Sequence, residues 1–424
     1  MRFSRWTSVL VGVVMVGCGG SDDPPATTDT GVDTGVDSGT DTLADTGADT
    51  IVDTGAEVET GPSCATALAP TDTVLEVDKS YKGGASNGTK ACPFVTVTAA
   101  LVARKSVITK IHVRGDSTSP FVYDEASSLD LPADLALEGD GPDATVIKGV
   151  GTCLTTTCAI LVKGAGTLKG LRVESTTGNA IVAQSFGGRV TITNVVAANS
   201  GLAGILVTAD VALGPNAKAT GNKGAGVHST GTGPSGLLVT GDGNEFSSNG
   251  THGILVVGDA PLSIEGATVA DKNTQNGVSL EGTVVVGPTT RHGINKLSAK
   301  GNGRAGVSIL NGQKVLINQS VLNGNAMGLY YDFAGKPVGN LDIGQAPLLA
   351  GDVFGGATSN NTAAGVFLCN TPGLVVAGGN KWSKCAPSSA TLTSCTATVS
   401  TYSDVVLAGT GGGSVNASDC SVGP

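Results

Sequence analysis

Short aliphatic runs between turn residues recur along the middle of the chain, from Asn199 to Leu368. Each run follows one phrase, in which an Asn is followed after three residues by a Gly and then by an aliphatic residue. The regular copies begin at Asn222, Asn249, Asn273, Asn302 and Asn361, and looser copies begin at Asn199 and Asn325. The glycines of these copies are separated by 22, 27, 24, 29, 22 and 37 residues. A repeat of this length, built from short strands and turns, predicts a β-solenoid.

Alternation along each short strand divides its residues between two faces. The first and third residues after each Gly should share a face, because strand side chains alternate. These residues are almost all apolar, so they form the predicted core: Ile205, Val207, Val227, Ser229, Ile254, Val256, Val278, Leu280, Val307, Ile309, Leu329, Tyr331, Val366 and Leu368. The residue between them should point outward: Leu206, His228, Leu255, Ser279, Ser308, Tyr330 and Phe367.

The recurring Asn and Gly have a structural explanation. Gly adopts the tight or left-handed backbone that a turn requires. An Asn side chain can bond to neighbouring backbone and stack on its counterpart one coil away. We therefore interpret the Asn column as a structural ladder, in preference to a row of sugar-binding amides.

Composition agrees with a narrow aliphatic core. The 424 residues include 64 Gly, whereas aromatic residues are 4% and charged residues 14% of the chain. A large globular enzyme normally uses more aromatic bulk to fill its core. We predict an all-β chain with an N-terminal cap over residues 64–110, a parallel β-helix over 111–380 and a disulfide-rich closing cap or tail over 381–424.

The first 17 residues have the features of an export signal. Arg2 and Arg5 form a basic end, and the apolar run at 9–16 is too short to span a bilayer. The sequence Met15-Val16-Gly17-Cys18 resembles the lipobox of bacterial lipoproteins, with Met where Leu is usual. The resemblance implies cleavage before Cys18, lipidation of that residue and anchoring to a membrane. An ordinary signal peptide with an incidental Cys is the lesser alternative to a lipobox, because the polar run begins directly at this point. Gly19, where no Asp follows the Cys, favours the outer membrane of the cell envelope.

Residues 18–63 are expected to form a disordered tether. Asp recurs every fourth residue from Asp29 to Asp53, and residues 22–59 hold eleven acids and no Lys or Arg. Such a segment buries no apolar surface and repels itself. Loose Ca²⁺ binding or glycosylation of its Thr residues is a lesser alternative to a solvated spacer. Without residues 1–63 the chain has 24 acidic and 23 basic residues, so no broad basic face for nucleic acid is expected.

Two segments after the tether carry a family resemblance. Pro93-Phe94-Val95-Thr96-Val97, followed by Ala99-Ala100-Leu101, resembles an N-terminal cap domain of uncharacterised function found in right-handed parallel β-helix proteins. Gly139-Asp140-Gly141 with Thr145-Val146-Ile147 resembles the first coil of pectin-lyase-like β-helices. The resemblance covers residues 80–375 with the repeats. It implies a right-handed parallel β-helix solenoid whose open end is capped by a short helix, with Thr96 or Thr98 as its N-cap. Pectin methylesterases share the second phrase, but the catalytic Asp contexts of those enzymes are absent.

Eight Cys residues remain after Cys18. An even count in an exported protein favours disulfides. No Cys-x-x-Cys pair and no nearby His supports a metal site, so neither metal nor cofactor is predicted. The simplest arrangement pairs neighbours: Cys64 with Cys92, Cys153 with Cys158, Cys369 with Cys385 and Cys395 with Cys420.

One stretch offers a weak candidate for catalysis. Arg291, His292 and Arg304 belong to a basic span that also contains Lys296 and Lys300, and Asp271, Lys272 and Glu281 come one coil earlier. Polysaccharide lyases that share the pectin-lyase-like fold use a base, often Arg or Lys, to remove a proton next to a carboxylate, which is commonly neutralised by Ca²⁺ on Asp. A solvated turn is the preferred interpretation, because the spacing is irregular and no family catalytic motif is present.

A second stretch offers a weak binding site. Tyr330 and Asp332 would face outward in the densest aromatic patch, and His292 is a further candidate contact. His112 is expected to pack in a strand, and His228 and His252 lack partners at metal-ligand spacing. We expect a non-catalytic envelope lipoprotein that binds polysaccharide or another envelope protein, or serves a structural role. A polysaccharide lyase or glycoside hydrolase is the alternative, which requires Asp271, Lys272, Arg291 and Arg304 to line one groove.

Overall fold

The computed structural model describes Cys64 and most of the chain from Asp72 onward. The described ranges are 72–184, 187–208, 210–231, 236–282, 292–336, 340–343, 361–376, 380–382, 389–392, 394–395, 403–409, 414–416 and 421–422. The export signal, the tether, Cys18, Arg291, Cys385 and Cys420 lie outside the described residues. The predictions for these segments and residues stay predictions.

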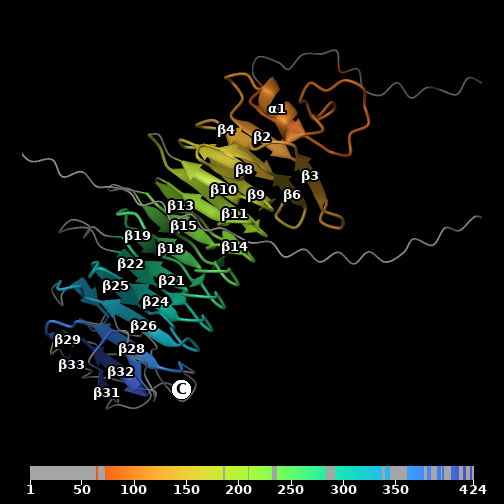
Figure 1. Ribbon diagram of the computed structural model, residues 1–424. Coiled ribbons are helices and arrows are strands. Elements are labelled where there is room, and N and C mark those ends of the chain that lie inside the picture. Colours follow the sequence, from red (N-terminus) through yellow and green to blue (C-terminus); the bar gives the residue numbers. More distant parts are fainter. Residues whose placement is uncertain are drawn as a thin grey trace, which may run out of the picture. The chain divides into compact units, whose positions relative to one another are not determined.

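Two parallel sheets form the body of the molecule (Figure 1). Sheet A has 17 described strands: β1 (Val74–Val77), β2 (Lys110–Val113), β3 (Phe121–Glu125), β5 (Ala136–Gly139), β6 (Thr145–Gly149), β9 (Thr167–Glu174), β11 (Val190–Ala198), β13 (Val211–Leu213), β14 (Lys218–Thr220), β16 (Leu237–Val239), β17 (Asn244–Glu245), β19 (Leu262–Ile264), β20 (Thr268–Val269), β22 (His292–Asn295), β23 (Leu297–Ser298), β25 (Val315–Asn318) and β27 (Leu341–Asp342).

Sheet B has 13 described strands. It contains β4 (Leu129–Leu131), β8 (Thr156–Lys163), β10 (Asn179–Gln184), β12 (Ile205–Val207), β15 (Val227–Ser229), β18 (Ile254–Val256), β21 (Val278–Leu280), β24 (Ala305–Ile309), β26 (Met327–Asp332), β28 (Ala364–Cys369), β32 (Ser403–Ala408) and β31 (Ser389–Leu392), with β7 (Gly151–Cys153) antiparallel to β8. Two short pairs near the C-terminus join β29 (Leu374–Val376) to β33 (Ser414–Asn416) and β30 (Lys381–Trp382) to β34 (Ser421–Val422).

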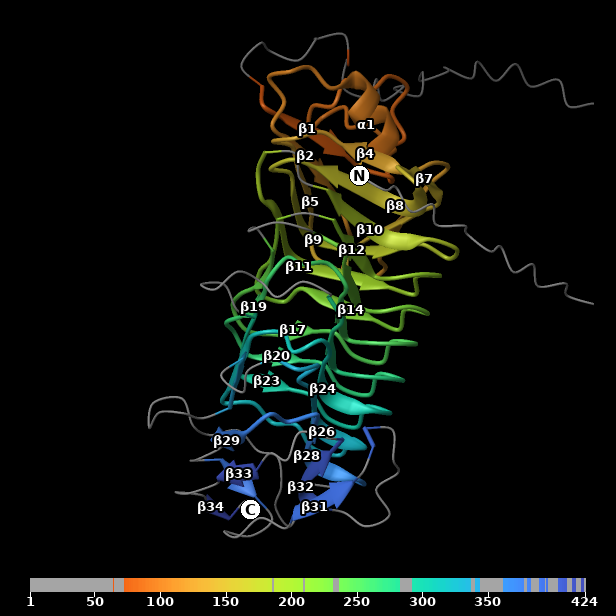
Figure 2. The same ribbon diagram turned by 60° about the vertical axis from the view of Figure 1, so that its left-hand side comes forward.

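Coils in the middle of the body contribute one strand to sheet B and two to sheet A. The strands β12, β13 and β14 form one coil, and they pair in parallel with β15, β16 and β17 of the next. Figure 2 shows the strands stacked coil upon coil. This connectivity defines the fold. The chain is a parallel β-helix. The parallel ladder of sheet B continues through β32 and β31, beyond residue 380 where the closing segment was expected to begin.

The core lies inside the coils and follows the predicted alternation. Ile205, Val227, Ile254 and Val278 are all fully buried, and so are their partners two residues later in each strand, apart from Ser229 and Val256 at 1% exposure. These side chains belong to one continuous aliphatic cluster that extends from Leu75 to Val405. Because each coil fills its interior with side chains from three short strands, few aromatic residues are needed.

The Asn column forms a buried ladder at one corner of the coils, as predicted. The side-chain Nδ2 of Asn222 donates to Oδ1 of Asn249 at 2.9 Å, and Asn249, Asn273 and Asn302 each donate to the next Asn at 3.0 Å. Each acceptor oxygen also receives the backbone N–H of the preceding Asn. The Gly beside the ladder is required by close approach, since a Cβ on Gly226 would lie 2.7 Å from the carbonyl oxygen of Gly253.

The N-terminal end of the coils is covered by helix α1 (Val97–Ala103). Thr96 is the N-cap and accepts a hydrogen bond from the N–H of Ala99 at 3.1 Å. The buried carboxylate of Glu125 accepts the N–H groups of Val97 and Thr98. These contacts satisfy helix donors that would otherwise be buried without partners. None of the helices in the described part of the chain is long and apolar enough to cross a membrane.

Three disulfides join described residues. Cys64 is bonded to Cys92 and Cys153 to Cys158, which are the expected pairs. The third bond joins Cys369 to Cys395. The expected pairing of Cys369 with Cys385 and of Cys395 with Cys420 is therefore wrong. The reason is register, because β32 pairs with both β28 and β31 and this brings the residues after β31 beside the end of β28.

Candidate functional site

The outward face of sheet B changes character along the coils. The register aligns one outward residue per strand, in the order Leu206, His228, Leu255, Ser279, Ser308, Tyr330 and Phe367. A second outward column beside the Asn corner aligns Ala203, Ala225, His252, Asn276 and Ala305. Because the alanines and serines are small, they leave recesses between their larger neighbours.

Two cavities occupy these recesses. One, of about 490 Å3, extends from Thr155 and Asn179 to His228 and Leu255. The other, of about 420 Å3, is lined by Asn276, Glu281, Arg304, Ala305, Ser308, Leu310, Met327, Tyr330 and Cys395. His252 lies in register between Ala225, which lines the first cavity, and Asn276, which lines the second. The two cavities share no lining residue, and His252 lines neither of them. We call the two cavities together the sheet-B groove.

A chain of polar contacts crosses the middle of this groove. Asn276 donates through Nδ2 to Ser279 Oγ at 3.2 Å, and Ser279 Oγ donates to Glu281 Oε1 at 2.9 Å. The same carboxylate oxygen lies 3.9 Å from Nε2 of His252. His252 is only 6% exposed, and its Nδ1 has no hydrogen-bond partner among the described residues. A buried polar atom of this kind is stabilised when a ligand supplies the missing partner.

Burial controls the charge of the two histidines in the groove. Burial lowers the pKa of His252, and the nearby Arg304 and His228 lower it further. The Glu281 carboxylate acts in the opposite direction and raises this pKa, but the net shift is downward. Burial also lowers the pKa of His228, again opposed by Glu281. Both imidazoles are therefore neutral at neutral pH and can each donate one hydrogen bond and accept another. Arg304 is exposed and lines the second cavity, where its guanidinium can bind a carboxylate through two parallel hydrogen bonds.

Tyr330 provides an aromatic wall at one end of the groove. Its ring stacks on that of Phe367, with centroids 5.5 Å apart and planes inclined by 26°. Burial raises the pKa of the Tyr330 hydroxyl, so it stays protonated and can donate. Its neighbour Tyr331 points inward, as alternation predicts, and donates to the backbone oxygen of Gln313 at 2.7 Å.

The described members of the predicted catalytic group do not all line one cavity. Asp271 accepts hydrogen bonds from the backbone N–H of Lys300 and from Ser298, and burial raises its pKa. Lys272 is exposed in a left-handed turn at φ 57°. Both precede Asn273 at the Asn corner, whereas Arg304 follows Asn302 and lines the groove. Arg291 lies outside the described residues. Among the described residues of that group, Glu281 and Arg304 share a cavity, and Asp271 and Lys272 do not line it.

Two of the predicted binding residues serve the fold. His292 is fully buried in β22, where its Nδ1 accepts the N–H of Leu262 at 3.0 Å, and burial lowers its pKa to about 4. Its assignment to an exposed basic stretch is therefore wrong, because the strand alternation of β22 places His292 and Ile294 inside. Asp332 accepts from the N–H of Ala334 and from Asn370, so it stabilises a turn. Of the three predicted binding residues, Tyr330, Asp332 and His292, only Tyr330 lines the sheet-B groove.

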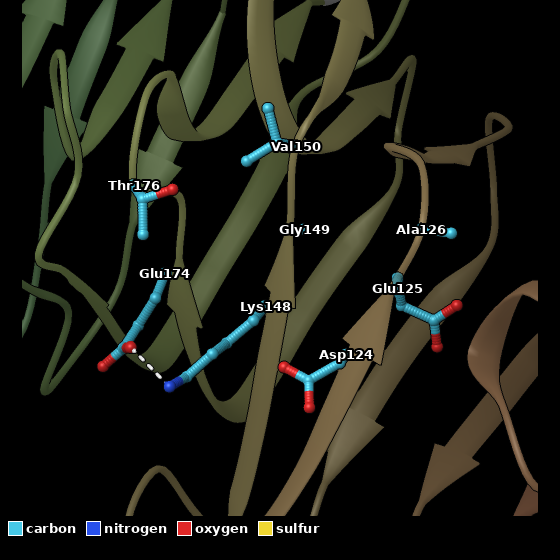
Figure 3. Close-up of a pocket in the computed structure, with 8 residues that line it drawn as sticks. All are labelled: Asp124, Glu125, Ala126, Lys148, Gly149, Val150, Glu174 and Thr176. Atoms are coloured by element: carbon cyan, nitrogen blue, oxygen red, sulfur yellow. Dashed lines mark ion pairs between the residues drawn. The ribbon is translucent and has the colours of Figure 1, made fainter. Parts of the chain in front are cut away.

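A third cavity, of about 320 Å3, lies on sheet A and has paired charges (Figure 3). Lys148 extends toward Glu174, with Nζ and Oε2 3.4 Å apart, and Arg172 binds the other oxygen of Glu174 at 2.7 Å. Glu125 at its edge is occupied by the N-terminus of α1. Because these groups already satisfy one another, the cavity is a weaker candidate for ligand binding than the sheet-B groove.

A charged cluster near the cap was not foreseen from the sequence. His112 was expected to pack in a strand, but its Nδ1 lies 2.8 Å from Glu76 Oε2 and its Nε2 lies 2.9 Å from Asp140 Oδ1. Burial lowers the pKa of His112, but hydrogen bonds and charge from the two carboxylates outweigh it and raise the pKa overall. Arg114 binds Asp78 at 3.2 Å beside this cluster. The cluster joins β1 of the cap to the first coils.

The groove cluster could be found only in part from the sequence. The outward position of His228 follows from the alternation. His252, Glu281 and Arg304 come from three further coils separated by steps of different length, so no spacing rule aligns them. Within the described ranges, no group of three or more His, Cys, Asp or Glu residues could hold a metal ion.

No protein-family model and no curated protein matches the chain. Among solved structures, it is similar to the A-module of the mannuronan C-5 epimerase AlgE4 of Azotobacter vinelandii, with 17% identity, a TM-score of 0.42 and coverage of 78% of this chain and 94% of that one. The A-module of the mannuronan C-5 epimerase AlgE6 of the same organism has 15% identity and a TM-score of 0.42, and the match covers 77% of this chain and 93% of that one. The Dettilon tailspike protein has 12% identity and a TM-score of 0.28, and the match covers 70% of this chain and 68% of that one. These similarities concern the fold and leave the function to the site itself.

Proposed function

We propose that this chain is an exported envelope lipoprotein whose β-helix binds polysaccharide along the sheet-B groove. The observation that supports the proposal is the groove itself, which presents one aromatic ring, one exposed cation and several hydrogen-bonding side chains over successive coils. A row of such groups at the regular spacing of a sheet suits an extended polymer of polar units. The protein then needs no catalytic step.

The chemistry of the groove suits sugars in particular. Tyr330 offers a ring on which a pyranose can pack, and its hydroxyl remains a donor. Asn276 and Ser308 line the second cavity and His228 lines the first, and these neutral side chains offer hydrogen-bonding groups, as sugar hydroxyls require. Arg304 forms no ion pair with any described carboxylate, so it is available to an acidic sugar.

Binding of full-length protein to immobilised polymers tests the proposal. The panel contains polygalacturonate, polymannuronate and uncharged dextran. We expect the uronate polymers to bind, and Arg304→Ala and Tyr330→Ala each to weaken binding about tenfold, or about 1.4 kcal/mol. Arg189→Ala is the matched control, because Arg189 pairs with Asp210 on sheet A away from the groove. Absence of binding to every polymer, or equal loss in the control, would reject the groove as a polysaccharide site.

One observation favours a second candidate function, that of a carbohydrate-active enzyme. Glu281 and His252 form an acid–base pair beside a cavity that also contains Arg304. Absorbance of unsaturated products from the uronate polymers, with and without Ca²⁺, would detect a lyase. We expect no turnover. Turnover by the wild type that Glu281→Gln abolishes, without loss of binding, would establish the enzyme instead.

The envelope location has its own test. The sequence around Cys18 supports lipidation, and the three disulfides are typical of an oxidising compartment. Expressed in a Gram-negative host with a labelled fatty acid, the full chain should acquire the label and fractionate with membranes. Cys18→Ala should be unlabelled. Equal labelling of the two proteins would contradict the proposed anchor.

A further inference from the structure

The first cavity of the sheet-B groove differs from the second in charge. None of the described residues that line it is an Asp, Glu, Lys or Arg, whereas Glu281 and Arg304 line the second cavity. An ionised ligand group that entered the first cavity would lose water without meeting an opposite charge. The first cavity therefore suits an uncharged group, and it has to be considered as a site by itself.

Exposed apolar side chains gather around the first cavity. Leu206 of β12 and Leu255 of β18 line it from the sheet, and Leu202, which also lines it, is 45% exposed. Leu154, in the turn between β7 and β8 that borders the cavity, is 47% exposed, and Val257, directly after β18, is 44% exposed. Apolar side chains that are exposed together mark a binding surface, whereas single exposed ones do not.

A neutral imidazole lies in the middle of this apolar surface. The register places His228 between Leu206 and Leu255 on adjacent strands, which are about 4.8 Å apart. Thr208 and Thr230 line the same cavity, but their hydroxyls already donate to backbone oxygens at 3.3 and 3.5 Å. Within the described chain, no hydrogen bond joins the His228 ring to another residue. The ring can therefore donate one hydrogen bond to a ligand and accept another.

This combination of groups selects a particular ligand chemistry. An acyl ester or amide is uncharged, its carbonyl oxygen accepts a hydrogen bond, and its alkyl group can pack against leucine. A bare sugar hydroxyl would bond to His228 but would leave the leucines against a polar group. A purely apolar ligand would cover His228 without a partner, which costs free energy. Ala203 and Ala225 beside the column are small and leave room for a short alkyl group.

We infer that the first cavity binds an acyl-substituted, uncharged unit of a saccharide, with the acyl carbonyl on His228 and the alkyl group between Leu206 and Leu255. The inference rests on the polysaccharide-binding function proposed above and specifies the ligand further. The two leucines are two strand spacings apart, or about 10 Å, so the site is short. It acts independently of the second cavity, because the two share no lining residue.

A comparison of two uncharged polymers tests the inference with the full-length protein. Partially O-acetylated dextran and unmodified dextran of the same chain length are immobilised beside the uronate polymers. We expect the acetylated dextran to bind about tenfold more tightly than the unmodified one, and Arg304→Ala to leave this ratio unchanged. Equal affinity for the two dextrans, or binding of neither, would overturn the inference alone if the uronate polymers still bind. Absence of binding to all of these polymers would overturn both proposals.

Variants of the cavity test which groups bind the acyl unit. Leu255→Ser should weaken binding of acetylated dextran about tenfold. Val102→Ser is the matched control, because Val102 is 83% exposed on α1 of the cap and should leave binding unchanged. His228→Leu retains the apolar surface but removes the N–H donor, so it should weaken binding as well.

A folded His228→Leu variant that binds acetylated dextran as tightly as the wild type, or more tightly, would indicate a purely apolar ligand and overturn the acyl assignment. Equal losses in Leu255→Ser and Val102→Ser would remove the first cavity as the site. Circular dichroism confirms that each variant is folded. If a cavity variant does not fold, the comparison of the two dextrans with the wild type decides the matter.

Discussion

His112 and His292 both lie on strands of sheet A, yet their environments act on their protons in opposite directions. His292 is enclosed by the core, which disfavours the charged imidazolium and lowers its pKa to about 4. His112 lies between the carboxylates of Glu76 and Asp140, which favour the imidazolium and raise its pKa. The two residues should therefore give opposite dependences of stability on pH.

For His292, stability should decrease on acidification. The unfolded chain takes up this proton near pH 6.5 and the folded chain only near pH 4, so the unfolded state binds more protons between these values. Wild-type protein should lose about 3 kcal/mol more of its free energy of unfolding between pH 7 and 4 than His292→Leu. Urea titrations at both pH values measure the free energy of unfolding of the two proteins. Parallel pH profiles for the two proteins would contradict it.

For His112, stability should decrease as the solution becomes alkaline. Its contribution is fully present below the unfolded pKa of about 6.5 and is lost as the pH rises through the raised folded pKa. Melting temperatures at pH 6 and 8.5 should therefore differ more for wild type than for His112→Gln. His228→Gln is the control, because burial lowers the pKa of the His228 imidazole in the wild type. An unchanged difference in His112→Gln would contradict the prediction.

At the scale of elements, the Asn ladder determines how one coil joins the next. Each amide is buried, donates to the following Asn and accepts from the preceding one. The turns need these bonds because their backbone groups have no sheet partners there. An Asn in the middle of the ladder is bonded on both sides, so its loss affects two neighbouring coils.

Asn273→Ala should be strongly destabilising for this reason. It leaves the backbone N–H of Asn249 and one of its two side-chain N–H groups without an acceptor, while the other side-chain N–H keeps its bond to the carbonyl oxygen of Ala219. An unsatisfied buried polar group costs about 1–3 kcal/mol, so we expect a loss of about 3 kcal/mol in the free energy of unfolding. Gln275→Ala, in the same turn but less buried, should change it by less than about 0.5 kcal/mol. Similar losses in the two variants, measured by urea unfolding, would show that the ladder is not stabilising.

The elements themselves were largely predictable from the sequence. The alternation after each Gly located the core residues from Ile205 to Leu368, and the Asn phrase located the ladder, because both depend on local geometry. His292 was misplaced because the step from Gly277 to Gly306 is 29 residues long, and the sequence pattern within it does not mark where β22 begins. The pairing of Cys369 with Cys395 depends on β32 lying between β28 and β31, an order that differs from the order along the chain.

At the scale of the whole molecule, disulfides occur near the ends of the described coils and are absent from the described coils between them. The bonds join Cys64 to Cys92, Cys153 to Cys158 and Cys369 to Cys395. In a solenoid each coil contacts only its neighbours, so the terminal coils have the fewest stabilising contacts. Cross-links there should oppose fraying where it would begin.

Reduction should therefore loosen the ends before the middle. After treatment with dithiothreitol, amide hydrogen exchange should accelerate in β28 and β32, and exchange in β15, β18 and β21 should change little. Mass spectrometry of peptic fragments resolves these regions. Uniform acceleration along the coils would indicate instead that the β-helix unfolds as one cooperative unit.

The site was less predictable than the fold, since it depends on cross-coil register. His252, Glu281 and Arg304 meet because their coils stack, although the steps between them vary in length. Asp271 and Lys272 are close to this group in the sequence, but the Asn corner separates them from it.

The ladder also has a direction, since every side-chain amide between Asn222 and Asn302 donates toward the C-terminal neighbour and accepts from the N-terminal one. Each of these coils therefore presents an amide N–H donor to the next coil and an amide oxygen acceptor to the previous one. A whole coil could be duplicated or deleted and the flanking amides would still match. Gain or loss of a whole coil would lengthen or shorten both sheets without redesign of the fold, so the length of the solenoid is a property that this architecture can evolve one coil at a time.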